Sequence, residues 1–153
     1  MSDTTTPLEL RISRMLPATP EEVFDAYTDA EKQKIWFSIL DARPGIVEID
    51  VDLRVGGTQI AIWGADPDNL FRETQTFLEI DRPHRLVTES TGSSPDGMTM
   101  TTRIEITFDV EGDGTRMTVV QTGFPIPEIR DFFVDEVWNG ALARITAYLE
   151  RHR

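Results

Sequence analysis

Few side chains in this sequence form a pattern that is typical of nucleophilic, acid–base or metal chemistry. The chain has two histidines and no cysteine, which excludes disulfides, thiolate catalysis and cysteine-bound metals. His84 lies in the turn-like segment DRPHRL and His152 in the final RHR. Neither has a second histidine or a carboxylate three or four residues away on a helix, as a helical metal site would need. We therefore predict no metal, no cofactor and no catalytic residue.

The segment LFRETQTFLEI is where a buried carboxylic acid side chain could arise. Its two faces alternate, and we expect the face that includes Leu78 to point inward, which would bring Thr74 and Thr76 to the mouth of an internal hollow. A β-bulge would exchange the two faces. Glu73 and Glu89 could then point inward, and a buried carboxylate is a candidate general acid or base. For both residues, however, we expect the carboxylate to lie in solvent.

A second polar group is predicted where two long strands pair. The segments MTMTTRIEITFDV and TRMTVVQTGF flank Asp113-Gly114, a strong hairpin signal. This pairing would place Gln121 near Thr102 and Met100. Flexible apolar walls with a few orienting polar groups are typical of a ligand pocket. From the pattern alone, an end of the sheet that is open to solvent explains these residues equally well.

Large aromatic residues complete the candidate site. Trp36 ends a predicted helix, Trp63 ends a predicted strand, and Trp138 lies in the first turns of the last helix. Such rings supply stiff contact area for a ligand, although packing in the core would explain each of them as well. The ligand-binding residues that we predict are Trp36, Trp63, Thr74, Thr76, Met100, Thr102, Gln121, Phe124, Trp138 and Leu142.

The elements that must position these residues follow from periodicity and turn signals. LELRISRML has strand period, and two capping boxes beginning at Thr19 and Thr28 predict two short helices after it. Six further segments with strand period follow, joined by turn-like sequences such as ADPDN and DRPH. A long amphipathic helix begins near Pro127. Strands joined by short turns predict an antiparallel meander, whose apolar face the last helix must cover.

The composition limits the kinds of molecule that this chain is expected to bind. The 153 residues suit one domain, which we place at 8–150, with tails at 1–7 and 151–153. Fifteen basic and 27 acidic residues give a net charge of −12, which disfavours nucleic acid and anionic membrane surfaces as partners. No apolar run is long enough to span a membrane. The first residues lack the pattern of a signal peptide, so we expect a cytoplasmic protein.

Five segments, in order, resemble the heat-shock-protein-ninety ATPase activator homologue-like family, within the START and birch-pollen-allergen-like (SRPBCC) superfamily. They are ATPEEVFDAYTDAEKQKIWF, RVGGTQI, FLEIDRPHRLV, ITFDVEGDGTRMTVVQTGF and WNGALARITAYLE. The resemblance implies an α+β helix-grip fold, in which a curved seven-stranded antiparallel sheet surrounds a long C-terminal helix. It also implies two short helices after the first strand and a hydrophobic cavity between sheet and helix.

Three functions are compatible with this resemblance. The first, which we prefer, is binding of a small apolar molecule in the cavity between sheet and helix, without catalysis. The alternative is a co-chaperone-like domain that binds a protein partner through its acidic surface. The separate N-terminal domain of the family's co-chaperone has no counterpart in 153 residues, which counts against that role. A cyclase or dehydratase would need a buried acid–base pair and ranks third. The family includes both monomers and homodimers, and either would fit.

Overall fold

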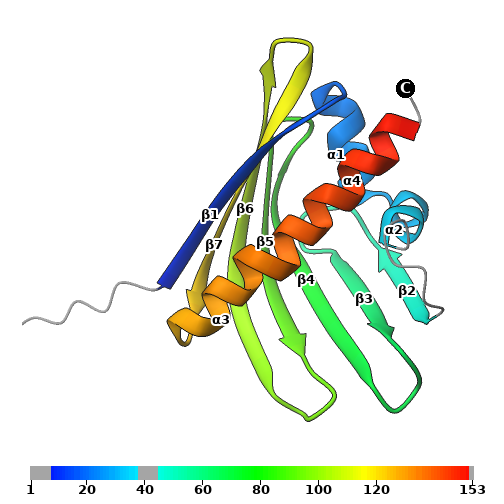
Figure 1. Ribbon diagram of the computed structural model, residues 1–153, viewed down its shortest axis with the longest axis vertical. Helices are drawn as coiled ribbons and strands as arrows, with labels where there is room; N and C mark the ends of the chain where they lie inside the picture. Colours follow the sequence, from blue (N-terminus) through cyan, green and yellow to red (C-terminus); the bar gives the residue numbers. More distant parts are fainter. Residues whose placement is uncertain (1–7, 38–44, 152–153) are drawn as a thin grey trace, which may run out of the picture.

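Seven antiparallel strands form one curved sheet in the computed structural model, which describes residues 8–37 and 45–151 (Figure 1). The strands are β1 (Leu8–Leu16), β2 (Ile46–Val51), β3 (Thr58–Gly64), β4 (Leu70–Asp81), β5 (Arg85–Ser93), β6 (Thr99–Glu111) and β7 (Gly114–Phe124). Their order across the sheet is β1-β7-β6-β5-β4-β3-β2. Strands β2 to β7 are therefore a meander of neighbouring hairpins, and β1 joins its far edge beside β7.

The helices lie on the concave side of this sheet (Figure 1). They are α1 (Pro20–Thr28), α2 (Ala30–Phe37), α3 (Pro127–Phe132), the π-helical segment η1 (Phe133–Trp138) and α4 (Asn139–Arg151). The last three follow one another without a break and cross the sheet diagonally (Figure 1). The predicted helix-grip fold is confirmed, including the helix start at Pro127. His152 and the predicted tail at 1–7 lie outside the described residues.

Both short helices begin at capping residues, but the second cap differs from the prediction. The Thr19 hydroxyl accepts from the Glu22 backbone N–H at 3.2 Å, and the Glu22 carboxylate accepts from the Thr19 N–H at 3.0 Å. For α2 the capping side chain is Asp29, which accepts from the Lys32 backbone N–H. Thr28 is instead buried, and its hydroxyl donates to the Phe24 carbonyl. The expected cap at Thr28 is thus wrong by one residue.

Removing the first cap is expected to lower the free energy of unfolding. Thr19→Ala leaves the backbone N–H of Glu22 without its side-chain acceptor, which should cost about 1 kcal/mol. Urea unfolding followed by circular dichroism measures this cost. Thr19→Ser keeps the hydroxyl and is the matched control, with an expected change of a few tenths of a kcal/mol at most. Equal midpoints for Thr19→Ala and the wild type would mean that the capping box does not stabilise α1.

The predicted inner faces of β6 and β7 are confirmed over the middle of the hairpin, but Met98 and Val110, expected on the same face, are exposed. Side chains at alternate positions of both strands are buried: Thr102, Ile104, Ile106, Phe108, Met117, Val119 and Gln121. The register places Ile104 opposite Gln121 and Ile106 opposite Val119, so these side chains share one face. The hairpin turn itself lies one residue before the predicted pair, because β6 ends at Glu111 and β7 begins at Gly114.

The predicted inner face of β4 is wrong over the first half of the strand. The register between β4 and β5 shifts between Phe77 and Glu79, which marks a β-bulge. Beyond the bulge Ile80 packs against the core, as expected, but Leu78 is 43% exposed. Before the bulge the buried residues are Gln75 and Phe77. The bulge therefore exchanges the two faces, which is the alternative that the sequence left open.

The long helix covers the sheet unevenly. It approaches the sheet most closely at β1 and β7, and its upper part also contacts α1 and α2. The β3–β4 and β5–β6 hairpins extend beyond it (Figure 1). The core includes the contact between α1 and β6, where the rings of Phe24 and Phe108 have centroids 5.3 Å apart. No helix within the described residues is long and apolar enough to cross a membrane.

Candidate functional site

One cross-strand row on the inner face combines a carboxyl group with small or flexible neighbours. Ala61, Glu73, Gly92 and Met100 lie directly opposite one another on β3, β4, β5 and β6. Residues that face each other across antiparallel strands share a side of the sheet. Gly92 is the second-to-last residue of β5 and Met100 the second of β6. The row therefore lies toward the hairpin ends that extend beyond the long helix.

Glu73 is the chemically distinctive member of this row. The Ser90 hydroxyl donates to its Oε2 at 2.7 Å, and the Gln75 amide donates to its Oε1 at 3.1 Å. Burial raises the pKa of the Glu73 carboxyl above its ordinary value, and these two hydrogen bonds oppose the rise only in part. The side chain nevertheless keeps some exposed surface, since Glu73 is only half-buried. It is the inward-facing carboxylate that the sequence allowed only if a bulge exchanged the two faces, and for which we expected a position in solvent.

Three further polar residues continue the network from Glu73 toward α1. Gln75 is buried and accepts at 2.8 Å from the Thr88 hydroxyl, so both ends of its amide are used. Tyr27 of α1 is buried as well, and its hydroxyl is hydrogen-bonded to the Gln75 side chain. Burial and then the nearby Glu73 raise the pKa of Tyr27 well above its ordinary value. Glu89, the second predicted candidate acid, is exposed and lies opposite Thr76 and Arg103 on the outer face.

Open space lies beside Glu73 at Gly92. A Cβ atom built on Gly92 would meet one atom within 4 Å, the backbone oxygen of Arg72 at 3.9 Å. The backbone of Gly92 does not have a positive φ, so the absence of a side chain is not a conformational requirement there. Met100, the next residue in the row, is only half-buried. A side chain at position 92 would therefore meet few protein atoms beside the carboxyl group of Glu73.

The predicted polar group at Gln121 exists and is fully hydrogen-bonded. Gln121 donates to the Thr102 hydroxyl at 2.8 Å, and the Trp138 indole N–H donates to Gln121 Oε1 at 2.8 Å. All three side chains are buried. Trp138 also stacks on Tyr27, with ring centroids 6.3 Å apart. This chain of hydrogen bonds ties the long helix to β6 and β7 and lies next to the Glu73 network.

The remaining predicted site residues lie in four places. Leu142 and Phe124 are buried in the core, and Phe124 packs on Phe133 at 5.2 Å. Trp36 is buried between the short helices, and its indole N–H donates to the Ala26 carbonyl. Trp63 is half-buried near the end of β3.

Trp63 stacks on the exposed ring of Phe71 at 5.8 Å. The predicted orientation of Thr74 and Thr76 is wrong. Both lie on the outer face, because the bulge turns Gln75 inward and Thr76 faces the exposed Glu89.

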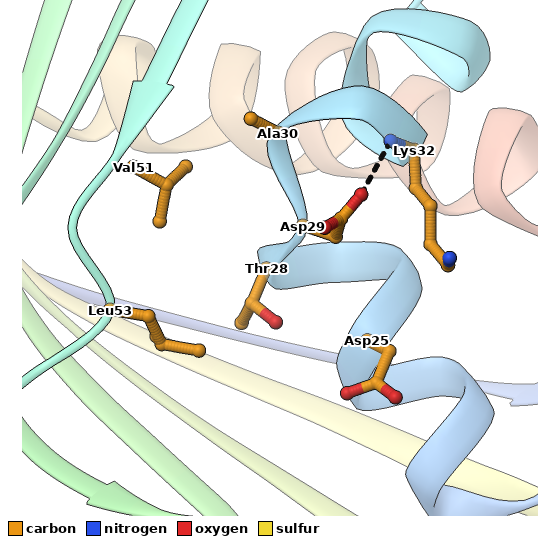
Figure 2. Close-up of a pocket in the computed structure, with 7 residues that line it drawn as sticks. All are labelled: Asp25, Thr28, Asp29, Ala30, Lys32, Val51 and Leu53. Atoms are coloured by element: carbon orange, nitrogen blue, oxygen red, sulfur yellow. Dashed lines mark hydrogen bonds between the residues drawn. The ribbon is translucent and has the colours of Figure 1, made fainter.

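A surface pocket of about 340 Å³ lies between the α1–α2 junction and the end of β2 (Figure 2). It is lined by Asp25, Thr28, Asp29, Ala30, Lys32, Val51 and Leu53. Three of its four polar side chains already serve the fold: Asp25 pairs with Arg82, Asp29 caps α2, and Thr28 bonds a backbone carbonyl.

Sequence reasoning missed Tyr27, Gln75, Thr88, Ser90 and Gly92. The last three share a face with Leu86, but the adjacent Val87 is equally apolar and buried, so strand period alone does not set the phase of β5. The inward orientation of Gln75 could be predicted only if the position of the bulge were known. Tyr27 belongs to the apolar stripe of α1, and no local signal predicts that its hydroxyl reaches β4. Among the described residues, no three histidine, aspartate or glutamate side chains gather as a metal site.

Comparison with known proteins agrees with this architecture. The family model described as activator of Hsp90 ATPase homolog 1-like protein matches residues 17–150. The structure of Mll3558 from Rhizobium loti has 22% sequence identity and a TM-score of 0.75, covering 94% of this chain and 97% of that one. A protein from Rhizobium leguminosarum has 20% identity and a TM-score of 0.78, with 95% and 96% covered.

DynU16, described as a protein in the dynemicin biosynthetic locus, has 18% identity and a TM-score of 0.70. The match covers 95% of this chain but 48% of DynU16, so the chain spans about half of that protein's length. At these identities the three structures show a shared fold. None of the curated proteins compared with the chain matches it.

Proposed function

This chain belongs to the activator of Hsp90 ATPase homolog 1-like family, and we propose that it binds a small, mostly apolar molecule on the inner face of its sheet. The observation that carries the proposal is the open space at Gly92 beside Glu73. An apolar wall with a few convergent polar groups is the usual composition of a small-molecule site. The family, and a structural neighbour from a biosynthetic locus, support the same class of function.

Two properties of Glu73 support an enclosed binding site. Its pKa is raised by desolvation, which requires protein atoms around it, yet its side chain keeps exposed surface. Both follow if that surface faces a hollow rather than bulk solvent. Met100 adds a flexible thioether side chain to the same row, and such side chains adapt to ligands of different shape. Trp63, Trp138 and Gln121 remain proposed wall residues of the same site.

Filling the hollow is expected to abolish ligand binding without unfolding the protein. The neutral apolar dye N-phenylnaphthylamine should bind the wild type, with a rise in fluorescence. Gly92→Leu places a branched side chain in the open space and should weaken binding by at least about tenfold, or about 1.4 kcal/mol. Thr91→Leu adds the same side chain one residue away, on the exposed outer face, and should leave the dissociation constant unchanged.

Two outcomes of this titration would count against the proposal. A wild-type protein that leaves the dye fluorescence unchanged has no accessible apolar site. Equal binding by Gly92→Leu and Thr91→Leu would place the dye elsewhere, for example at the exposed Phe71 ring. Circular dichroism and urea unfolding of both variants show whether each retains the fold, so that loss of binding is not confused with loss of structure.

Acid–base catalysis at the same site is a second candidate, favoured by one observation. A carboxyl group with a raised pKa beside a phenol is the kind of pair that a cyclase or dehydratase would use. Turnover of a bound ligand that is lost in Glu73→Gln, with binding retained, would establish it. The co-chaperone-like alternative rests on the acidic composition and the family, and a salt-sensitive protein partner recovered with the purified chain would favour it.

A further inference from the structure

Glu73 has hydrogen-bond donors but no cationic partner among the described residues. Its two oxygens accept from Ser90 and Gln75, both of them neutral. The ion pairs of the described residues are formed by other carboxylates, such as the Asp25–Arg82 pair and the two that Arg85 makes with Glu79 and Glu105. A carboxylate that is taken out of water without an opposite charge is strongly disfavoured. The site therefore holds an acid whose ionised form no described residue neutralises.

The strands beside Glu73 present neutral groups to it. Within the row, β3 contributes Ala61, β5 contributes Gly92 and β6 contributes Met100. From α1 comes Tyr27, whose pKa the nearby Glu73 raises. Its phenol is neutral at physiological pH because burial and Glu73 both raise its pKa. Since the described partners of Glu73 are neutral, a cationic ligand would supply the opposite charge.

We propose that the ligand of this site carries a protonated amine, which pairs with the Glu73 carboxylate while its apolar part occupies the space beside Gly92 and Met100. This inference rests on the proposed binding function and specifies its ligand class. Each carboxylate oxygen accepts one hydrogen bond from the protein and has capacity for another. A charge-assisted hydrogen bond from an ammonium group is stronger than one from a neutral donor. The net charge of −12 favours approach of a cation and opposes an anion.

Proton exchange accompanies this binding. In the free protein the carboxyl group keeps its proton over a pH range in which an exposed glutamate has lost it, because burial raises its pKa. An opposite charge close to a carboxylate lowers its pKa again. An ammonium ligand therefore binds as a cation, Glu73 becomes ionised, and the displaced proton goes to solvent. A neutral ligand leaves the carboxyl group protonated and releases none.

A matched pair of compounds tests the ligand class directly. Phenylbutylamine and phenylbutanol have the same carbon skeleton and differ in the amine and the hydroxyl group. Each is titrated into the full chain at neutral pH by calorimetry, and each is tested for displacement of N-phenylnaphthylamine. The amine should bind the wild type at least about tenfold more tightly than the alcohol, since hydrogen bonds to charged groups contribute about 1.5–3 kcal/mol. Glu73→Gln should remove this preference.

Glu89→Gln is the control variant, because it removes the same charge from the outer face of the neighbouring strand. It should leave the preference for the amine unchanged. Wild-type calorimetry in two buffers with different ionisation enthalpies adds a readout that needs no variant. The amine should release a measurable fraction of a proton for each molecule bound, and the alcohol none.

The outcomes separate this inference from the proposed function. Equal affinity for both compounds, or a preference for the amine that persists in Glu73→Gln, overturns the ligand class and leaves apolar binding intact. Binding of the amine without proton release, and with the affinity of the alcohol, has the same consequence. If the dye and both compounds fail to bind the wild type, the proposed function and the ligand class are both wrong.

Discussion

Replacing Glu73 by glutamine is expected to raise the free energy of unfolding at neutral pH. The amide has nearly the shape of the protonated acid, so it can accept from Gln75 and donate to the Ser90 oxygen. It has no ionised form that must be kept out of the protein interior. Most substitutions of a buried polar residue destabilise a protein, and an increase in stability is therefore a distinctive result.

The sign of the pH dependence follows from the direction of the shift. Burial raises the pKa of Glu73 in the folded protein, whereas in the unfolded chain it has its ordinary value near 4.5. Between these two values the folded state retains a proton that the unfolded state has lost. Wild-type stability should therefore fall as the pH rises above that ordinary value, until the pH passes the folded-state pKa. Each unit of separation corresponds to about 1.4 kcal/mol.

Urea unfolding of the wild type and Glu73→Gln from pH 4 to pH 8 measures this difference. The two proteins should be similar in stability at the acidic end, and the variant should gain progressively as the pH rises. Glu89→Gln removes an exposed carboxylate and should change the free energy of unfolding by about 0.5 kcal/mol or less at any pH. A stability difference that does not vary with pH would mean that Glu73 has an ordinary pKa in the folded protein.

The elements were predictable where local signals and periodicity agree. The Thr19 box, the turn before β7 and the alternation around Ile104 and Ile106 each carry their own evidence within a few residues. The order of elements then restricts the topology, because strands joined by short turns pair with their neighbours. The start of the last helix at Pro127 was predictable for the same reason, since proline is favoured at the first helical position.

The centre of the candidate site was not predictable in this way. A one-residue bulge near Leu78 reverses the faces of β4, and no periodicity within the strand reveals where the extra residue lies. The predicted site was therefore wrong as well, because the bulge turns Thr74 and Thr76 outward and Glu73 inward. Tyr27 was missed for a different reason. Its role depends on a contact between α1 and β4, two elements that are far apart in the sequence.

Trp138 connects the long helix to the sheet, and its removal is expected to cause the largest loss of stability that we predict. Its side chain is 6% exposed, it stacks on Tyr27, and its N–H donates to Gln121. It also ends the π-helical segment η1, so the same residue lies where the helix changes its hydrogen-bonding pattern. Trp138→Ala should lower the free energy of unfolding by about 3–5 kcal/mol, as for other buried aromatic residues.

Trp138→Phe separates packing from hydrogen bonding within this effect. Phenylalanine keeps much of the ring contact with Tyr27 but has no N–H, so Gln121 Oε1 loses its donor inside the protein. An unsatisfied buried acceptor costs about 1–3 kcal/mol, which should place this variant between the wild type and Trp138→Ala. Val137→Ala, at an exposed neighbouring position, should cost less than either. If the alanine and phenylalanine variants were equally unstable, the hydrogen bond to Gln121, rather than ring packing, would hold the helix to the sheet.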